Sequence, residues 1–253
     1  MSEFLTPERV DAARSAATLL FAVAQPVAGQ ASRLFGGGEP IEERSAKARS
    51  PVTPADGAFA IWGPIFAASL NYAVRAAARR DDPLIRRTGW LTAAAYAGDT
   101  AWELWAQYRN VGWRSVAIIG ATAGAANAAM LAAARADPEE PSRALVLNSV
   151  APLAGWLTVA TAANLGGARL AEGGPADRPA QTRAAVALVT GAAAAASALS
   201  YASRGNPLYA VATGWGLGGV AVRNARERNG PVLIAALAGL AAVAGATFLA
   251  RRA

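Results

Sequence analysis

Most charged residues of this chain lie in the gaps between long apolar segments. Most of these segments are close to the about 20 residues that an α-helix needs to cross a bilayer. There are eight: Ala12–Ala31, Ala58–Ala78, Gly89–Tyr108, Gly112–Ala134, Ala144–Ala168, Ala184–Ser203, Asn206–Val222 and Pro231–Ala250. The seventh is short and rich in glycine. The pattern therefore predicts an all-α, multi-pass membrane helical bundle.

An alanine-rich soluble bundle is the main alternative, because the mean hydropathy of +0.25 is low for a multi-pass membrane protein. Two features favour the membrane. The segments are apolar on all faces, whereas a surface helix of a soluble protein keeps a polar stripe. The third segment also has aromatic residues at both ends, Trp90 at one and Trp105 and Tyr108 at the other. From Trp90 to Tyr108 a helix rises about 27 Å, close to the hydrocarbon thickness.

The charge balance excludes several classes of partner and site. The net charge is +7, but the arginines fall in short clusters that flank apolar segments, as anchors at lipid headgroups do. No basic stripe interleaved with aromatics runs along one element, so we expect no nucleic-acid partner. With no Cys and no His, disulfides, His- or Cys-ligated zinc or haem, and a Ser-His-Asp triad are excluded. We expect no metal site and no catalytic residues.

Two polar stretches divide the chain. Residues 36–56 contain three glycines and three prolines and are predicted to form a loop over one membrane face. Residues 166–183 are similar in character and separate the first five apolar segments from the last three. We therefore predict one part over residues 1–168 and a second over 169–253. The first helix is predicted to begin at Thr6-Pro7, a capping hydroxyl followed by proline.

Two acids lie inside the third apolar segment. Asp99 and Glu103 are four residues apart, so both carboxyls lie on one helical face, and Trp102 is three residues after Asp99. Acids within membrane segments usually face a bundle interior, a cavity or a proton path, because burying a carboxylate in lipid is costly. The alternative is a purely structural hydrogen bond to a neighbouring helix.

Two further segments carry aromatic and polar residues at helical spacing. In the second segment, Trp62 and Phe66 are i, i+4 and should stack on one face. In the fifth, Trp156, Ala160 and Asn164 form an i, i+4, i+8 stripe. The small Ala160 allows close approach, and Asn164 brings a donor and an acceptor to the same face. Ordinary aromatic packing and interhelical hydrogen bonding are the alternatives.

These stretches resemble the tryptophan-rich sensory protein (TspO/MBR, translocator protein) family. In this family the second helix comes after a Pro-containing loop and carries a signature in which Phe is followed by Trp. The third helix carries Asn-x-x-Trp, and the fifth carries Trp-x-x-x-Ala-x-x-x-Asn. The matching residues here are Phe59, Trp62 and Phe66, then Asp99 and Trp102, then Trp156, Ala160 and Asn164. The order and separation agree over roughly residues 12–168. One departure is that Asp99 replaces the family's neutral Asn.

The resemblance implies a five-helix bundle, here followed by about three extra transmembrane helices that resemble the longer family members. It also implies a cleft that binds tetrapyrroles such as porphyrins, or other hydrophobic ligands such as sterols. Residues 36–56 would close the cleft. Family members commonly dimerise, so the expected partners are a hydrophobic small molecule, membrane lipid and a second copy of the chain. The implied lining is Trp62, Phe66, Asp99, Trp102, Trp156, Ala160 and Asn164, with Glu103 beside it as a ligand-binding candidate.

Three functions follow as hypotheses. The first is a binding, sensory or transport protein for a flat aromatic metabolite such as a porphyrin, since Trp rings offer stacking surfaces. Without His, a metal-free porphyrin suits the chain better than haem. The second is photo-oxidation of a tetrapyrrole, which no nucleophile or cofactor motif supports. The third is proton-coupled transport with Asp99 and Glu103 as the relay. A scaffolding role is a fourth alternative.

Overall fold

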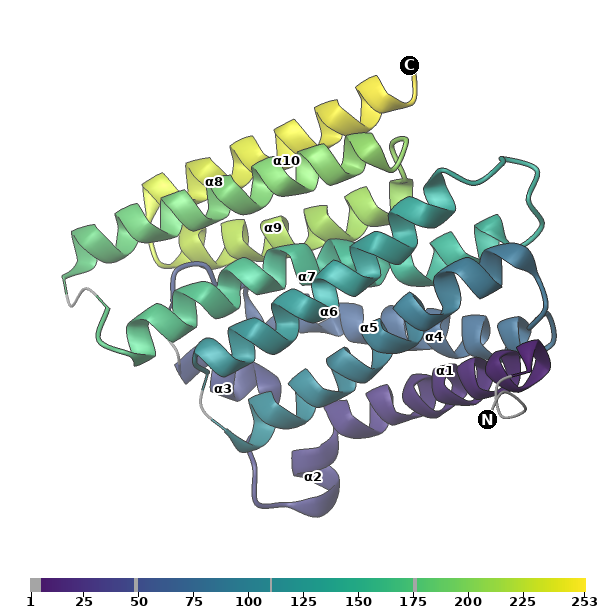
Figure 1. The fold of residues 1–253 in the computed structure, drawn as a ribbon. Helices are drawn as coiled ribbons and strands as arrows, with labels where there is room; N and C mark the ends of the chain where they lie inside the picture. The colour runs from purple at the N-terminus through teal and green to yellow at the C-terminus, as the bar shows by residue number, and fades with distance from the viewer. Residues whose placement is uncertain (1–5, 48–49, 110, 175–176) are drawn as a thin grey trace.

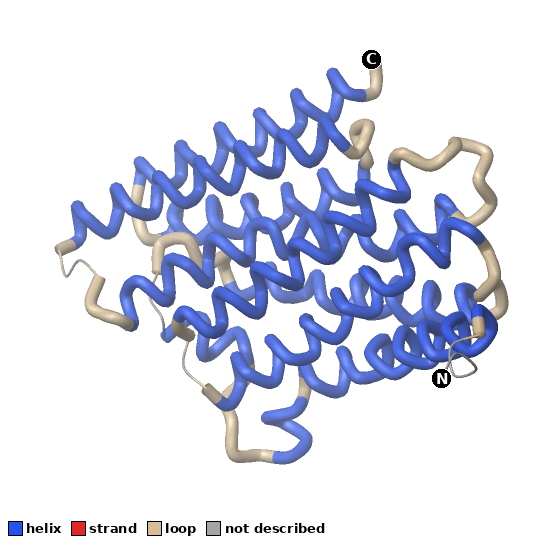
Figure 2. The backbone as a smooth tube through the Cα atoms, viewed as in Figure 1, coloured by secondary structure: helices blue, strands red, loops and turns tan. Residues whose placement is uncertain are grey.

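A computed structural model describes residues 6–47, 50–109, 111–174 and 177–253. Within these residues the chain is helical and contains no strand (Figure 2), which confirms the all-α prediction. The long helices are α1 (Pro7–Gly29), α4 (Trp62–Ala77), α5 (Pro83–Tyr108), α6 (Trp113–Ala134), α7 (Arg143–Ala171), α8 (Arg178–Ala202), α9 (Pro207–Arg226) and α10 (Gly230–Ala250). The short ones are α2 (Ala31–Phe35), α3 (Ile41–Lys47) and the 3₁₀ helix η1 (Asp56–Ile61).

The helices α1, α5 and α9 each begin with a capping side chain directly followed by a proline. At α1, the Thr6 hydroxyl accepts a hydrogen bond from the Arg9 N–H at 3.4 Å, as predicted. Asp82 caps α5, and Asn206 caps α9, each directly before a proline. These side chains satisfy N–H groups that have no partner inside the helix, and proline lacks the N–H at the position where none is needed.

The chain is a multi-pass integral membrane protein. Among the described residues, five stretches are long and apolar enough to cross a bilayer: residues 56–77, α6, α7, α8 and α10. The eight predicted segments all form helices, but α1, α5 and α9 fall outside this group of spans. For α5 the reason is visible in its sequence, because it buries Asp99, Glu103 and Gln107.

The helices lie side by side in one bundle, and both termini lie at the same end (Figure 1). α7 is central and packs against α4, α6, α8 and α9, while α10 packs on α8 and α9 at one edge. At the opposite edge, α1 packs against α4 and α5. Some buried α7 side chains, such as Ala151 and Ala154, are small, and they allow neighbouring helices to approach closely.

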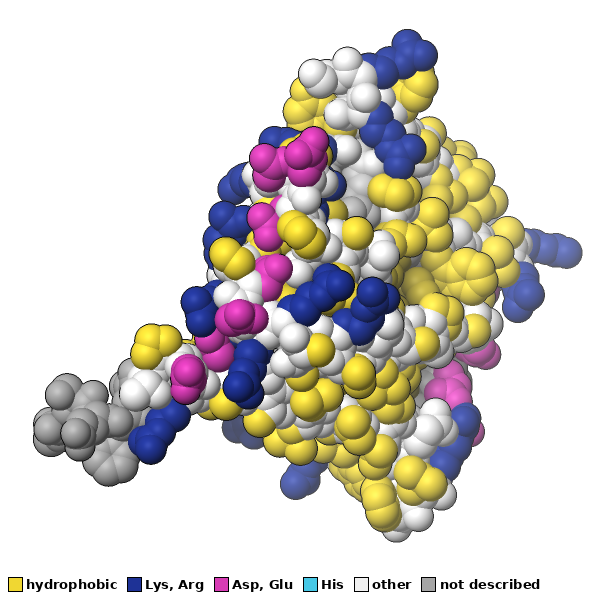
Figure 3. Space-filling view, turned by 90° about the vertical axis from the view of Figure 1, so that its right-hand side faces the viewer, with side chains coloured by type: hydrophobic (Ala, Val, Ile, Leu, Met, Phe, Trp, Pro, Cys, Tyr) yellow, Lys and Arg dark blue, Asp and Glu magenta, His cyan; other side chains and the backbone are white. Residues whose placement is uncertain are grey.

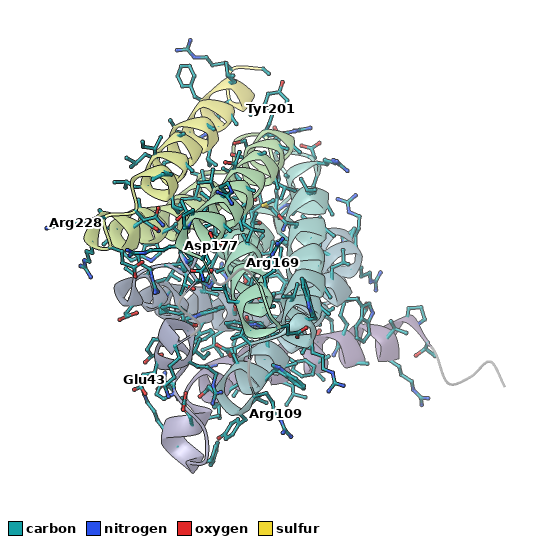
Figure 4. The ribbon with its side chains drawn as sticks, turned by 90° about the vertical axis from the view of Figure 1, so that its left-hand side faces the viewer. Glu43, Arg109, Arg169, Asp177, Tyr201 and Arg228 are labelled. Carbon is teal, nitrogen blue, oxygen red and sulfur yellow. The ribbon has the colours of Figure 1, made fainter. Side chains whose placement is uncertain are left out.

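Charged side chains gather at the two ends of the bundle. Figure 3 looks onto the end that holds the termini, where Lys, Arg, Asp and Glu lie together and hydrophobic side chains extend down the flank. At the other end lie Glu43, Arg109, Arg169 and Arg228 (Figure 4). This distribution suits a bundle whose ends meet water and lipid headgroups.

The predicted loop over residues 36–56 is partly helical, since it contains α3. The glutamates of α3 lie in its first turn and its basic residues in its last, which favours a short helix at the polar surface. α4 begins at Trp62, so Pro64 lies in its first turn and does not kink it. The predicted boundary at 168/169 falls within the last turn of α7, and the division into two parts stays a prediction.

Candidate functional site

Aromatic rings from three helices meet around Trp62 on α4. The Phe66 ring stacks on Trp62 at 5.5 Å between centroids and 16° between planes. Trp102 of α5 lies 6.2 Å away, and Trp156 of α7 meets Trp62 edge-on at 5.9 Å. Phe59 of η1 also meets Trp156 edge-on, at 5.9 Å between centroids. The predicted i, i+4 stack is therefore part of a larger aromatic cluster, with geometries that aromatic pairs prefer.

A small cavity lies beside this cluster. Its lining residues Val111 and Gly167 place it near the end of the bundle at which Figure 4 labels Arg109 and Arg169. Its volume is about 40 Å³. Water-sized cavities begin at about 10–15 Å³, so the enclosed space accommodates a few water molecules. Its lining is Ser45, Thr53, Pro54, Phe59, Trp102, Val111, Trp156, Ala160, Ala163, Asn164 and Gly167.

Asn164 fixes the polar wall of the cavity. Its side-chain oxygen accepts hydrogen bonds from the Trp102 indole N–H at 3.2 Å and from the Ser115 hydroxyl at 2.5 Å. Its amide donates to the Ala160 carbonyl at 3.0 Å. One side chain thus ties α5, α6 and α7 together, which orients Trp102 at the cavity wall.

Residues 50–59, here called the cover segment, close one side of the cavity through Thr53, Pro54 and Phe59. Helix α9 holds this segment in place. The Ala55 N–H donates to the Gly219 carbonyl at 3.0 Å, and the Trp215 indole N–H donates to the Ala58 carbonyl at 2.7 Å. The C-terminal part of the chain therefore contacts the site.

Asp99 and Glu103 lie on a different side of α5, away from the cavity lining. Asp99 accepts a hydrogen bond from the Gln25 amide of α1 at 2.9 Å. Glu103 lies against Gly29 of α1, since a Cβ added at Gly29 would be 3.0 Å from Glu103 Oε1. Both carboxyls are fully buried. The i, i+4 face predicted for them exists, and it faces α1.

The predicted residues thus form three groups. Trp102, Trp156, Ala160 and Asn164 line the cavity. Trp62 and Phe66 pack behind them in the aromatic cluster. Asp99 and Glu103 form a separate polar pair with α1. Sequence reasoning missed Ser115, Gln25 and the α9 residues, because a lone Ser, Gln or Trp carries no spacing signal for a contact between distant helices.

Two indole N–H groups at the site have no hydrogen-bond partner within the part of the chain that the structure describes. They belong to Trp62 and Trp156, both nine-tenths or more buried. A buried donor without an acceptor is uncommon and is destabilising unless something else accepts from it. The site therefore combines aromatic faces with unused donors, which suits a flat molecule that carries hydrogen-bond acceptors.

The family model described as TSPO-like protein matches residues 14–249, from α1 almost to the end of α10. No curated protein and no solved structure matches the chain.

Proposed function

Because this chain belongs to the TSPO-like protein family, we propose that it binds a flat aromatic ligand of the porphyrin class at the aromatic cluster and its cavity. The observation that carries the proposal is the meeting of Trp62, Trp102 and Trp156 from three helices. Their rings supply stacking surface, and the unused N–H groups of Trp62 and Trp156 would donate to acceptors on the ligand. A metal-free porphyrin fits best, because the chain has no His or Cys to ligate iron.

Binding requires the site to open. A cavity of about 40 Å³ is far below the about 300–1,000 Å³ of ordinary ligand pockets. The cover segment is the part that would move, since it contributes Thr53, Pro54 and Phe59 to the lining and lies between α3 and α4. The ligand would replace Phe59 against the Trp156 ring.

The test is titration of the purified protein with protoporphyrin, followed by porphyrin absorbance and Trp fluorescence. Trp156→Ala should weaken binding about tenfold, because loss of a stacking partner of about 1.4 kcal/mol corresponds to that factor. Trp90→Ala is the matched control, since Trp90 is 49% exposed on α5 and should leave the affinity unchanged. Equal affinities for the wild type and Trp156→Ala would contradict the proposal.

Proton-coupled transport is a second candidate, favoured by the burial of Asp99 and Glu103 in a helix interface. In this function the protonation of one acid would accompany ligand movement through the helical bundle. Uptake by liposomes should then depend on pH, and Asp99→Asn should abolish that dependence. Flux that is the same in both proteins would exclude the acid from the transport step.

A further inference from the structure

Four buried oxygens between α1 and α5 lack a hydrogen-bond partner among the described residues. They are Gln25 Oε1, Asp99 Oδ1 and both carboxyl oxygens of Glu103. All three side chains are 0% exposed. The Gln25 amide nitrogen bonds to Asp99 Oδ2 at 2.9 Å, so the oxygen of the same amide also lies beside the acids. The three side chains therefore place unused acceptors along one stretch of the α1–α5 interface.

Two buried carboxyls without a cation are expensive. A buried carboxylate loses its hydration, and this loss is normally offset by a cationic partner or by several donors. In the described part of the chain, Asp99 receives one hydrogen bond and neither acid appears in a salt bridge. The contrast with Asp11 is sharp, since that buried acid pairs with both Arg14 and Arg86.

The two helices are arranged to leave space for the acids. On α5, Asp99 and Glu103 are i, i+4, and on α1 the facing Gln25 and Gly29 have the same spacing. A Cβ at Gly29 would lie 3.0 Å from Glu103 Oε1 and 3.5 Å from the Phe66 ring. Glycine at this position therefore admits the Glu103 carboxyl, and Phe66 forms an apolar wall beside it.

We propose that Gln25, Asp99 and Glu103 bind a sodium ion at the α1–α5 interface. Hard cations prefer oxygen ligands, and carboxylate and amide oxygens are what this place offers. No group of three or more His, Cys, Asp or Glu side chains suited to a metal occurs in the described residues, so the site suits a weakly charged ion better than a transition metal.

A proton is the competing occupant, and the number of unused oxygens argues against it. One proton shared by the two carboxyls satisfies two oxygens and leaves the Gln25 carbonyl without a donor. A metal ion in this interface would instead take several of these oxygens as ligands. Sodium bound to two carboxylates leaves a net charge of −1 at the site. If one of the two carboxyls is also protonated while sodium is bound, the net charge of the site is zero.

The ion would stiffen the aromatic cluster without entering it. Phe66 lies beside Gly29 and stacks on Trp62, so the acids and the cluster share one ring as a wall. Ion binding therefore gives an optical signal from Trp62 or Trp102. The site does not depend on what occupies the cavity, because none of its three residues lines that cavity.

The experiment measures the unfolding temperature and Trp fluorescence of the purified protein at pH 8, with NaCl exchanged for choline chloride at constant ionic strength. A tenfold excess of sodium over its dissociation constant should raise Tm by about 4 °C. Asp99→Asn, Glu103→Gln and Gln25→Leu should each remove most of this shift. Asp11→Asn is the matched control, because it breaks a buried ion pair elsewhere on α1 and should keep the sodium response.

Equilibrium binding of radioactive sodium to the wild-type protein tests the site even if a variant does not fold. Saturable binding of about one ion per chain is the expected result. The proposal is overturned if the wild type binds no sodium, if Tm is the same in both salts, or if the sodium shift persists in the Asp99 and Glu103 variants. A protein that responds to acidification alone holds a proton in this place.

Discussion

Asp11 shows how a single residue anchors one edge of the bundle. It is buried, and its carboxylate contacts Arg14 at 2.7 Å and Arg86 at 2.5 Å, which joins α1 to the first turn of α5. Asp11 precedes the first apolar segment and lies at the end of the bundle. The Arg86 guanidinium hydrogen-bonded to it, with Arg14, holds the pKa of this carboxyl below its usual value of 3.8.

The depressed pKa of Asp11 predicts how stability depends on pH. A carboxyl whose pKa is lower in the folded protein contributes stability above its unfolded pKa, and the contribution disappears as the pH falls through the folded pKa. Asp11→Asn should therefore lower Tm at pH 7, and its difference from the wild type should shrink below about pH 4. Glu8→Gln is the control with little effect, since Glu8 is exposed in the same helix. A difference that is constant with pH would refute the ion-pair explanation.

At the residue scale, sequence spacing predicted which residues share a helix face better than it predicted their hydrogen-bond partners on other helices. Trp156, Ala160 and Asn164 share a face of α7, as their spacing indicated, and all three line the cavity. The Asn164 amide also donates a hydrogen bond to the Ala160 carbonyl. The partners of Asn164 on α5 and α6 were not predictable, because side chains on separate helices meet only after the helices have packed. For the same reason the spacing of Asp99 and Trp102 did not reveal that they serve different sides of α5.

The long helices could be predicted from the sequence because the apolar segments were long and their ends carried clear signals. The segment predicted to begin at Gly112 becomes α6, starting at Trp113, and that predicted at Pro231 becomes α10, starting at Gly230. The helices in the polar loop were not anticipated, because α3 has no apolar stripe and η1 is one short 3₁₀ stretch. The sequence also did not predict which helices pack together, since apolar segments of similar composition can pair in many ways.

The contact between α7 and α9 depends on a glycine. A Cβ added to Gly155 would lie 2.5 Å from the Tyr209 carbonyl oxygen and 3.0 Å from the Thr213 hydroxyl. The nearest atom belongs to backbone, so it cannot rotate away, and the helices would have to separate. Gly120 on α6 offers the opposite case, because nothing lies within 4 Å of an added Cβ there.

Gly155→Ala should lower the free energy of unfolding by about 1–3 kcal/mol, as overpacking does. Gly120→Ala should leave it unchanged or raise it by up to about 1 kcal/mol, because alanine favours the helix and meets no neighbour. Unfolding of both variants in detergent, followed by circular dichroism, separates them. If the two substitutions have the same effect, the α7–α9 approach is not limited by Gly155.

For the whole molecule, the C-terminal helices are more than an addition to a five-helix bundle. The family match runs through α8 and α9 into α10, and α9 packs on α7 and on η1. Gly219 allows the closest approach, since an added Cβ would lie 2.8 Å from the side chains of Pro54 and Ala58. Helix α9 therefore holds the cover segment in place, and under the proposed function it would govern how readily the cavity opens.

This coupling predicts that α9 controls the rate of ligand exchange. Trp215 donates to the Ala58 carbonyl, and Asn224 donates to the Pro51 carbonyl at 2.8 Å. Trp215→Phe removes the first bond and keeps an aromatic ring, so the cover should open more often. Dissociation of protoporphyrin should become several-fold faster, because loss of one hydrogen bond of about 1 kcal/mol corresponds to roughly fivefold.

Stopped-flow release of protoporphyrin into an excess of apo-albumin measures this rate. Trp90→Phe is the matched control, because Trp90 is exposed to the same 49% as Trp215 and lies on α5, outside the residues that line the cavity. Asn224→Ala should accelerate release as Trp215→Phe does, since its bond to Pro51 holds the other end of the cover segment. Release at the wild-type rate in both α9 variants would mean that the ligand leaves by another route, for instance past Val111 between α5 and α6.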